Sequence, residues 1–289
     1  MRRILILTVA FVLTLGVAMF AGTNIINALE RQSYTATYSM QVGAMTRTYE
    51  QIAPVAELPK SAPIIVVLSG IAVGVNDEVQ RDRLVPYVNT GQAELIYPTG
   101  FQESWNAGGC CGAAAHADVD DVAFLQALVA RVDPGHAHPV YMVGYSNGGR
   151  MAYRMACDYP GLFDGTAVVK AMPMPDCVVS QPLTILQIDS LDDTAVPYQP
   201  GDPGKEKPAA TVEVARLRAA DGCSDSPVVA PHSAMTLTTW AKCTSGERVG
   251  FAVWAVGGHN FPPPKGNTPG AAAVIWSFFT KTPLAPIPR

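Results

Sequence analysis

Apolar and polar residues alternate in one early part of the chain, whereas later segments are continuously apolar. Residues 34–54, "YTATYSMQVGAMTRTYEQIAP", alternate on both sides of Gly43, which predicts an antiparallel hairpin at a sheet edge. Residues 62–70, "APIIVVLSG", form a β-branched run that ends at a glycine. Such a run is typical of a strand buried on both faces. We therefore expect an edge hairpin followed by a buried central strand.

Further along the chain, strand-like runs alternate with segments of helical spacing. Within residues 118–132, Val122, Leu125, Leu128 and Val132 recur at helical spacing, behind aspartates that favour a helix start. The other strand-like runs are residues 93–100, 138–146, 182–189 and 251–256, and the other helical segments are residues 149–157 and 271–279. This alternation predicts an α/β fold with a mostly parallel sheet and helices on both faces.

The composition limits the number of domains and the kind of partner. With 289 residues, 48% of them hydrophobic, the chain can form one large domain, which we expect over residues 31–281. Residues 282–289 are expected to be a proline-rich tail. The formal net charge is −4 and no run of lysines or arginines occurs, so nucleic acid is not an expected partner. We expect a monomer.

Residues 1–30 form a separate piece. Arg2 and Arg3 precede the uncharged apolar run of residues 4–21, which is the pattern of an export segment. The run is short for a membrane span, long for the apolar part of a signal peptide, and not followed by a clean A-x-A site. A cleaved signal peptide and a membrane anchor both remain open, with cleavage favoured. The protein is expected to be secreted or extracytoplasmic, and to contact a membrane only through this segment.

The cysteine and histidine patterns favour disulfides over a metal site. Six cysteines, an even number, follow the export segment. No C-x2-C pair occurs, and the five histidines are scattered singly. We therefore expect oxidised cysteines, no bound metal and no organic cofactor.

The sequence Gly144-Tyr145-Ser146-Asn147-Gly148 is a G-x-S-x-G pattern between a predicted strand and a predicted helix. This context predicts a nucleophile elbow, in which small residues two before and two after the serine let strand and helix approach closely. A helix that begins at Asn147 would present free N–H groups and a positive dipole end beside the serine oxygen. Ser146 is the predicted nucleophile.

A serine nucleophile needs a histidine to accept its proton and an acid to orient that histidine. His259 follows a late strand behind two glycines, and Asp193 follows the strand before it, which gives the order serine, acid, histidine. Asp189 and Asp192 compete with Asp193, and position alone does not separate them. The remaining histidines lie in polar or glycine-rich loops and are expected at the surface: His116, His136, His138 and His232.

Several motifs together identify a family that the chain resembles. They are "WNAGGCCG", "DVDDVAFLQALV", "VGYSNGGRMAYRMAC", "DDTAVPY", "TTWAKC" between Cys223 and Cys243, "GGHNFP" and "IWSFF". Over residues 34–279 the chain resembles the secreted polyhydroxybutyrate depolymerase and feruloyl esterase group of α/β-hydrolases. The resemblance implies an α/β-hydrolase fold without a large lid.

The resemblance also assigns roles to residues. It implies Ser146 as nucleophile, Asp193 as acid and His259 as base. It implies the backbone N–H groups of Asn147 and Ile71 as the oxyanion hole. The residues that it places at the pocket are Trp105 and Asn106 near the rim, Tyr145, and Phe261 as an aromatic wall. The family usually has His-Gly where this chain has Ser69-Gly70 and again where it has Asp189-Ser190, which puts pocket shape and rate in doubt.

With the even cysteine count and the export segment, the family pattern leads us to expect three bridges. These are Cys223–Cys243, Cys111–Cys157 and Cys110–Cys177, with the partners of the two adjacent cysteines the least determined.

The expected function is hydrolysis of carboxylic esters through an acyl-enzyme. The ester substrate would be a small molecule or a polymer, of the short hydroxyalkanoate, hydroxycinnamoyl or acetyl type. Two alternatives stay open: an acyltransferase or peptidase on the same scaffold, since the fold does not determine the acceptor, and a non-catalytic binding module derived from an esterase.

Overall fold

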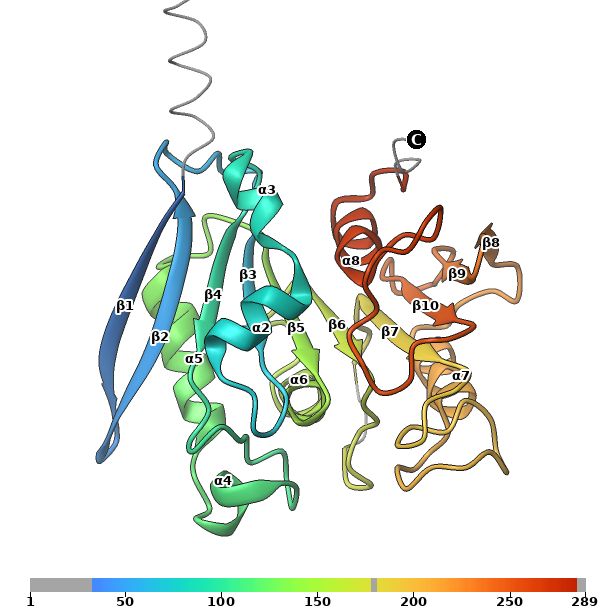
Figure 1. Ribbon diagram of the computed structural model, residues 1–289, viewed down its shortest axis with the longest axis horizontal. Coiled ribbons are helices and arrows are strands. Elements are labelled where there is room, and N and C mark those ends of the chain that lie inside the picture. Colours follow the sequence, from blue (N-terminus) through green and yellow to red (C-terminus); the bar gives the residue numbers. More distant parts are fainter. Residues whose placement is uncertain (1–32, 178–180, 285–289) are drawn as a thin grey trace, which may run out of the picture.

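The computed structural model describes residues 33–177 and 181–284, and these residues form one sheet of ten strands with helices on both of its faces (Figure 1). The predicted export segment, residues 1–30, lies outside the described residues. The strands are β1 Ser33–Val42, β2 Met45–Pro54, β3 Ile64–Leu68, β4 Glu94–Pro98, β5 Val140–Tyr145, β6 Gly165–Val169, β7 Ile185–Ser190, β8 Val228–His232, β9 Met235–Trp240 and β10 Val249–Trp254. The helices are α2 Val75–Asp82, α3 Val85–Asn89, α4 Gly112–His116, α5 Asp121–Val132, α6 Asn147–Asp158, α7 Ala210–Ala220 and α8 Ala271–Thr280.

The centre of the sheet is parallel and both of its edges are antiparallel. The strand order is β1-β2-β4-β3-β5-β6-β7-β10-β9-β8. Strands β4, β3, β5, β6, β7 and β10 run parallel to one another, whereas β1 and β2 form the predicted hairpin around Gly43. The α/β fold, the mostly parallel sheet and the N-terminal hairpin are therefore confirmed. A second antiparallel edge pair, β8 and β9, was not predicted.

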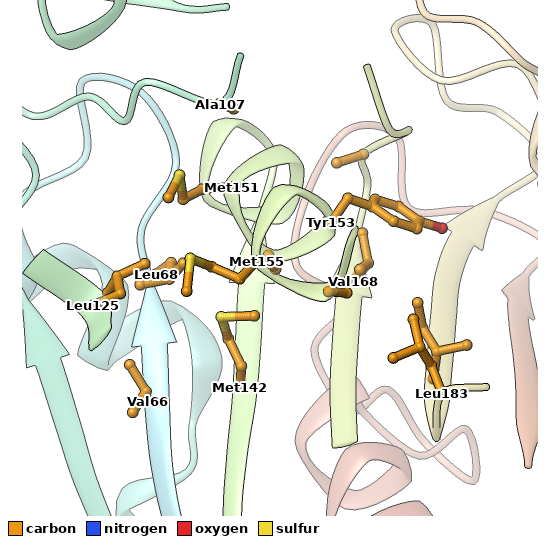
Figure 2. Packing of buried hydrophobic residues seen from close by; sticks show 14 of the residues in the cluster. Val66, Leu68, Ala107, Leu125, Met142, Met151, Tyr153, Met155, Val168 and Leu183 are labelled. Atoms are coloured by element: carbon orange, nitrogen blue, oxygen red, sulfur yellow. The ribbon is translucent and has the colours of Figure 1, made fainter. Parts of the chain in front are cut away.

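Alternate residues of the central strands pack into two separate cores. In β3, Ile64, Val66 and Leu68 face a core with α5, α6 and α7, whereas Ile65 and Val67 face a core with α3 and α8. Figure 2 shows the first of these, with side chains of α6 packed against the strands beneath it. Because both faces of β3 are covered, all five of its residues are apolar and buried.

The described cysteines form three bridges: Cys110–Cys111, Cys157–Cys177 and Cys223–Cys243. The last is as predicted. The predicted pairings Cys111–Cys157 and Cys110–Cys177 are wrong. The chain after β6 returns beside the end of α6 and brings the Cα atoms of Cys157 and Cys177 to 5.6 Å, within the normal range for a disulfide. The adjacent Cys110 and Cys111 then pair with each other.

None of the helices in the described part of the chain combines the length and the apolar character that a membrane span needs.

Candidate active site

Ser146 lies at a sharp turn between β5 and α6. Its backbone has φ 52° and ψ −115°, a conformation that is strained for a residue with a side chain. The Ser146 N–H donates to the carbonyl oxygen of Val169 at 2.9 Å, which joins the turn to the end of the neighbouring strand β6. The turn thus holds one serine at the carboxyl edge of the parallel sheet, as the G-x-S-x-G pattern predicted.

Close backbone contacts explain the glycines around this serine. A Cβ on Gly144 would lie 2.3 Å from the carbonyl oxygen of Gly148, and a Cβ on Gly148 would lie 2.3 Å from that of Leu68. Both distances are far shorter than any real contact of a Cβ with backbone oxygen. Strand β5, helix α6 and the end of β3 therefore approach one another only because these two positions lack side chains.

The structure brings Ser146, His259 and Asp193 into one hydrogen-bonded line. His259 Nε2 lies 3.0 Å from Ser146 Oγ, and His259 Nδ1 lies 3.1 Å from Asp193 Oδ2. Asp193 follows β7 and His259 follows β10, and these two strands are parallel neighbours. Their following loops consequently meet at the same edge of the sheet, although the two residues lie 66 positions apart.

The environment of Asp193 keeps its carboxylate charged. Burial alone would raise its pKa, but hydrogen bonds from His259 and from two backbone N–H groups outweigh burial and hold the pKa below its usual value. The N–H groups are those of Ala195 and Val196, which donate to Oδ1 at 2.8 and 3.1 Å. Both carboxylate oxygens also contact the imidazole, with His259 Nδ1 3.2 Å from Oδ1 and 3.1 Å from Oδ2.

Three aspartates competed for this position in the sequence, and the structure distinguishes them. Asp192 Oδ1 accepts from the N–H groups of Gly257 and Gly258, at 2.9 and 2.8 Å. Asp189 is completely buried, and Gln187 donates to its Oδ2 at 2.8 Å. Burial raises the pKa of Asp189 to about 7. Of the three, Asp193 is the one that contacts His259.

Of the two residues predicted to supply an oxyanion hole, Asn147 directly follows Ser146 and Ile71 lies shortly after the end of β3. Asn147 is the first residue of α6, where N–H groups lack partners within the helix. Ile71 follows Gly70, whose Cα is so close to the turn that an added Cβ would lie 3.5 Å from the Cβ of Ser146. The next N–H along the chain, that of Ala72, donates to the carbonyl oxygen of Glu103 at 2.9 Å, so it is not free to donate to an oxyanion.

Trp105, predicted to lie near the pocket rim, is fully buried. Its indole N–H donates to the carbonyl oxygen of Ser69 at 3.0 Å, and its backbone N–H and C=O bind the side-chain amide of Asn147 at 2.8 and 3.0 Å. Trp105 therefore links the side chain of Asn147 to the backbone of Ser69, two residues before Ile71. Asn106 is buried too, with its N–H bound to Asp121 Oδ2 at 2.7 Å. A tryptophan in a glycine-rich loop gave no sign of this burial.

Of the other two predicted pocket residues, Tyr145 lies beside the imidazole, with ring centroids 5.8 Å apart, and Phe261 lies beside Tyr145. The Tyr145 hydroxyl donates to the carbonyl oxygen of His259 at 2.7 Å, and its ring centroid lies 6.3 Å from that of Phe261. Phe261 lines a cavity of about 940 Å³ together with Trp254, Asn260 and Arg81. Both aromatic side chains are almost completely buried.

Sequence reasoning missed Lys170, whose buried Nζ lies 3.8 Å from Asp193 Oδ2. A charged residue directly after the apolar run "GTAVV" was the available signal. One group of potential metal ligands is present in the described residues, namely Asp221 with Cys223 and Cys243. Because these two sulfur atoms are bonded to each other, they offer no thiolate to a metal.

Proteins similar to this chain include named esterases. "Putative esterase NocK" from Nocardia uniformis subsp. tsuyamanensis is 31% identical over 271 residues, which cover 83% of this chain and 77% of that protein. "Probable feruloyl esterase C" from Aspergillus niger is 25% identical over 197 residues, 65% of each chain. The solved structure of acetyl xylan esterase from Aspergillus awamori matches with a TM-score of 0.50 over 78% of this chain and 94% of that one; at 13% identity this is a likeness of fold alone. No protein-family model matches the chain.

Proposed function

The chain belongs to the feruloyl esterase-like family of α/β-hydrolases, and from this premise we propose that it is a serine esterase acting through an acyl-enzyme. The observation that carries the proposal is the hydrogen-bonded line from Ser146 Oγ through His259 to Asp193. A serine at a strained turn, an imidazole in contact with it and an ionised carboxylate behind the imidazole are what nucleophilic acyl transfer requires.

In the first half of the reaction, Ser146 Oγ attacks the ester carbonyl carbon. His259 Nε2 takes the hydroxyl proton as the new C–O bond forms, and the carbonyl oxygen becomes an oxyanion. The N–H groups of Asn147 and Ile71 would donate to that oxyanion. When the intermediate collapses, His259 returns the proton to the departing alcohol oxygen, which leaves the acyl group on Ser146.

In the second half, water replaces the alcohol. His259 removes a proton from the water as its oxygen attacks the acyl carbon, and then protonates Ser146 Oγ as the carboxylic acid leaves. Asp193 stays ionised throughout and stabilises the imidazolium that forms twice in each cycle.

For the substrate we propose esters with short or aromatic acyl groups. The Aspergillus relative is named a feruloyl esterase, and Trp254 and Phe261 line a cavity that is also lined by Asn260, the residue after His259. A planar aromatic group gains both apolar burial and ring contacts in such surroundings.

We also propose that the protein is exported. The three disulfides among the described residues suit an oxidising compartment, and the apolar run of residues 4–21 suits an export segment. Comparing the N-terminal residue of mature protein with the sequence would show whether that segment is removed.

The test of the esterase proposal is labelling with a fluorophosphonate probe, combined with hydrolysis of p-nitrophenyl butyrate. We expect the folded protein to be labelled and to turn over the ester. Ser146→Ala should abolish both, whereas Ser39→Ala, at an exposed serine of β1, should change neither. A folded wild-type protein that is not labelled would overturn the proposal in favour of a binding module.

The acceptor is tested separately, by analysing products with an alcohol present as a competitor of water. Free acid as the main product is expected. A transesterified product in excess would identify an acyltransferase, and faster cleavage of the matched amide than of the ester would identify a peptidase.

A further inference from the structure

Lys170 is completely buried directly behind the candidate acid. It follows strand β6, and its Nζ donates to Ser190 Oγ and lies 3.8 Å from Asp193 Oδ2. Neither the Lys170 nor the Asp193 side chain is exposed to solvent. Removing an ammonium group from water is costly unless opposite charge compensates it, so the residues around Lys170 determine what this lysine can do.

Carboxylates surround this ammonium group. Asp189, Asp193 and Asp192 all raise the pKa of Lys170, in that order of strength. Asp189 Oδ2 is bound by Gln187, while no described residue donates a hydrogen bond to its Oδ1. The other titratable or charged groups around the cluster are Tyr153 and Arg150 of α6, Glu206 in the segment between β7 and α7, and His259.

Without the lysine, negative charge on the aspartates would act on the His259 imidazole uncompensated. Asp193 would place a negative charge behind His259, Asp189 would add to it to the extent that it is ionised, and such negative charge favours the imidazolium form. A histidine that is already protonated cannot accept the proton of Ser146. One buried positive charge between the carboxylates removes this excess while leaving Asp193 ionised.

Resting on the esterase proposal, we propose that Lys170 is a positioning residue for the triad. Its ammonium offsets the charge of Asp189 and attracts Asp193 Oδ2, one of the two oxygens that contact His259 Nδ1. The lysine charge thereby disfavours the imidazolium, the form that cannot accept the proton of Ser146.

Burial and charge act against each other in this cluster. Burial lowers the pKa of Lys170 to about 8, although the aspartates oppose that shift. Burial raises the pKa of Asp189 to about 7, although Gln187 and Lys170 oppose it. Each group thus favours the charged form of its partner, so removing one charge is expected to change the protonation of the other and the electrostatic field at His259.

The experiment follows the protonation of His259 in three variants of the full chain. These are Lys170→Met, which keeps a side chain of similar length without charge, Asp189→Asn, and the double variant. The first measurement is the pH titration of the low-field ¹H NMR signal from His259 Nδ1–H, identified by its absence in His259→Gln. The second is kcat/KM against pH for p-nitrophenyl butyrate, with thermal unfolding as the check on folding.

Lys170→Met should move the midpoint of the acid limb of kcat/KM to higher pH by about one unit, because the lost positive charge had disfavoured the imidazolium. Below the midpoint of the acid limb, kcat/KM should fall about tenfold, with KM changed less than twofold. Asp189→Asn should move the midpoint to lower pH. The double variant, which has the wild-type charge balance, should return it to the wild-type value.

Two results would overturn the proposal. One is an unchanged His259 titration in folded Lys170→Met. The other is a double variant that keeps the shift of Lys170→Met, since charge compensation would then be excluded. A purely structural lysine would lower the unfolding temperature without moving the midpoint. The NMR titration does not require turnover, so it tests Lys170 even if the esterase proposal fails.

Discussion

Asp192 accepts a hydrogen bond from the N–H of Gly258 at 2.8 Å, immediately before His259 in the chain. Its neighbour Asp193 instead binds the His259 imidazole, at 3.1 Å. Two adjacent carboxylates therefore fix the same histidine in different ways. One holds the loop that carries it, and the other orients the ring.

This division of roles predicts a ranking of variants. Asp193→Asn should lower kcat/KM by about four orders of magnitude, because an amide cannot stabilise the imidazolium and favours the wrong tautomer. Asp192→Asn should cost at most about tenfold, since its amide oxygen can still accept both glycine N–H groups. Ester hydrolysis by variants with matched thermal unfolding checks the ranking. The reverse order would mean that Asp192 is the acid.

Gly148 provides a test of the steric account of the turn. Gly148→Ala would place a Cβ 2.3 Å from the carbonyl oxygen of Leu68, so we expect a destabilisation of about 3 kcal/mol or more and a loss of esterase activity. Gly74→Ala is the matched control, because its φ is −70° and its Cβ would meet only Glu103, at 3.6 Å. Urea unfolding of both variants measures the difference, and an equally stable Gly148→Ala would contradict the steric explanation.

The parts of the site that could be predicted from the sequence are those in which the residues that act together are also neighbours in the chain. Gly144, Ser146 and Gly148 lie within five consecutive positions, so their packing requirement is visible in the sequence. The three aspartates of residues 189–193 all lie within three positions of the end of β7, and only the direction of each side chain separates them. No local pattern contains that information.

The elements that the sequence did not predict, such as α2 and β8, do not follow the rule that apolar residues are buried and polar residues exposed. Helix α2 buries the acidic residues Glu78 and Asp82, which a hydrophobic pattern assigns to the solvent side. Strand β8 leaves Val228 and Val229 exposed. The disulfide partners of Cys110 and Cys111 depended on the path of the chain after β6, which no spacing rule gives.

Glu78 is expected to make stability fall with rising pH. Burial, followed by the charge of Asp82, raises the pKa of Glu78 to about 8. In the unfolded chain a glutamate has a pKa of about 4.3. A carboxyl whose pKa is higher in the folded state contributes stability that is fully present at pH values below that unfolded pKa. The contribution is lost as pH rises through the folded pKa, at up to about 1.4 kcal/mol per pH unit.

Glu78→Gln removes this titration. Relative to wild type, the variant should therefore gain stability steadily between pH 5 and pH 8. Urea unfolding at pH 5, 6.5 and 8 measures the trend, with exposed Glu57→Gln as the control. A difference between Glu78→Gln and wild type that does not change with pH would disprove the assignment.

Two of the disulfides allow a comparison at equal loop length. Cys157–Cys177 and Cys223–Cys243 each span a sequence separation of 20. The chain-entropy model gives both about 3 kcal/mol, so replacing either pair by serines should cost about that much. Guanidinium unfolding measures the two costs. If they differ by more than about 2 kcal/mol, loop entropy is not the main origin of the stabilisation.

Mapping of unreduced peptides should also recover Cys110 and Cys111 linked to each other.

The aromatic wall of the cavity predicts a selectivity that depends on the acyl group. Phe261 and Trp254 line the same cavity as Gly257 and Asn260 of the His259 loop, so we expect a hydroxycinnamoyl group to reach them and an acetyl group to be too short. Phe261→Leu keeps an apolar side chain but removes the ring, and should lower kcat/KM for methyl ferulate about tenfold, the size expected when an aromatic contact of about 1 kcal/mol and some buried area are lost. Hydrolysis of p-nitrophenyl acetate by the same variant should change less than threefold. Equal losses on ferulate and acetate would indicate that Phe261 supports the His259 loop and does not contact the acyl group.

The proposed substrate class also predicts the chain-length preference of the wild type. Palmitoyl esters should be poorer substrates than butyryl or feruloyl esters. An optimum at palmitoyl would contradict the proposed substrate class.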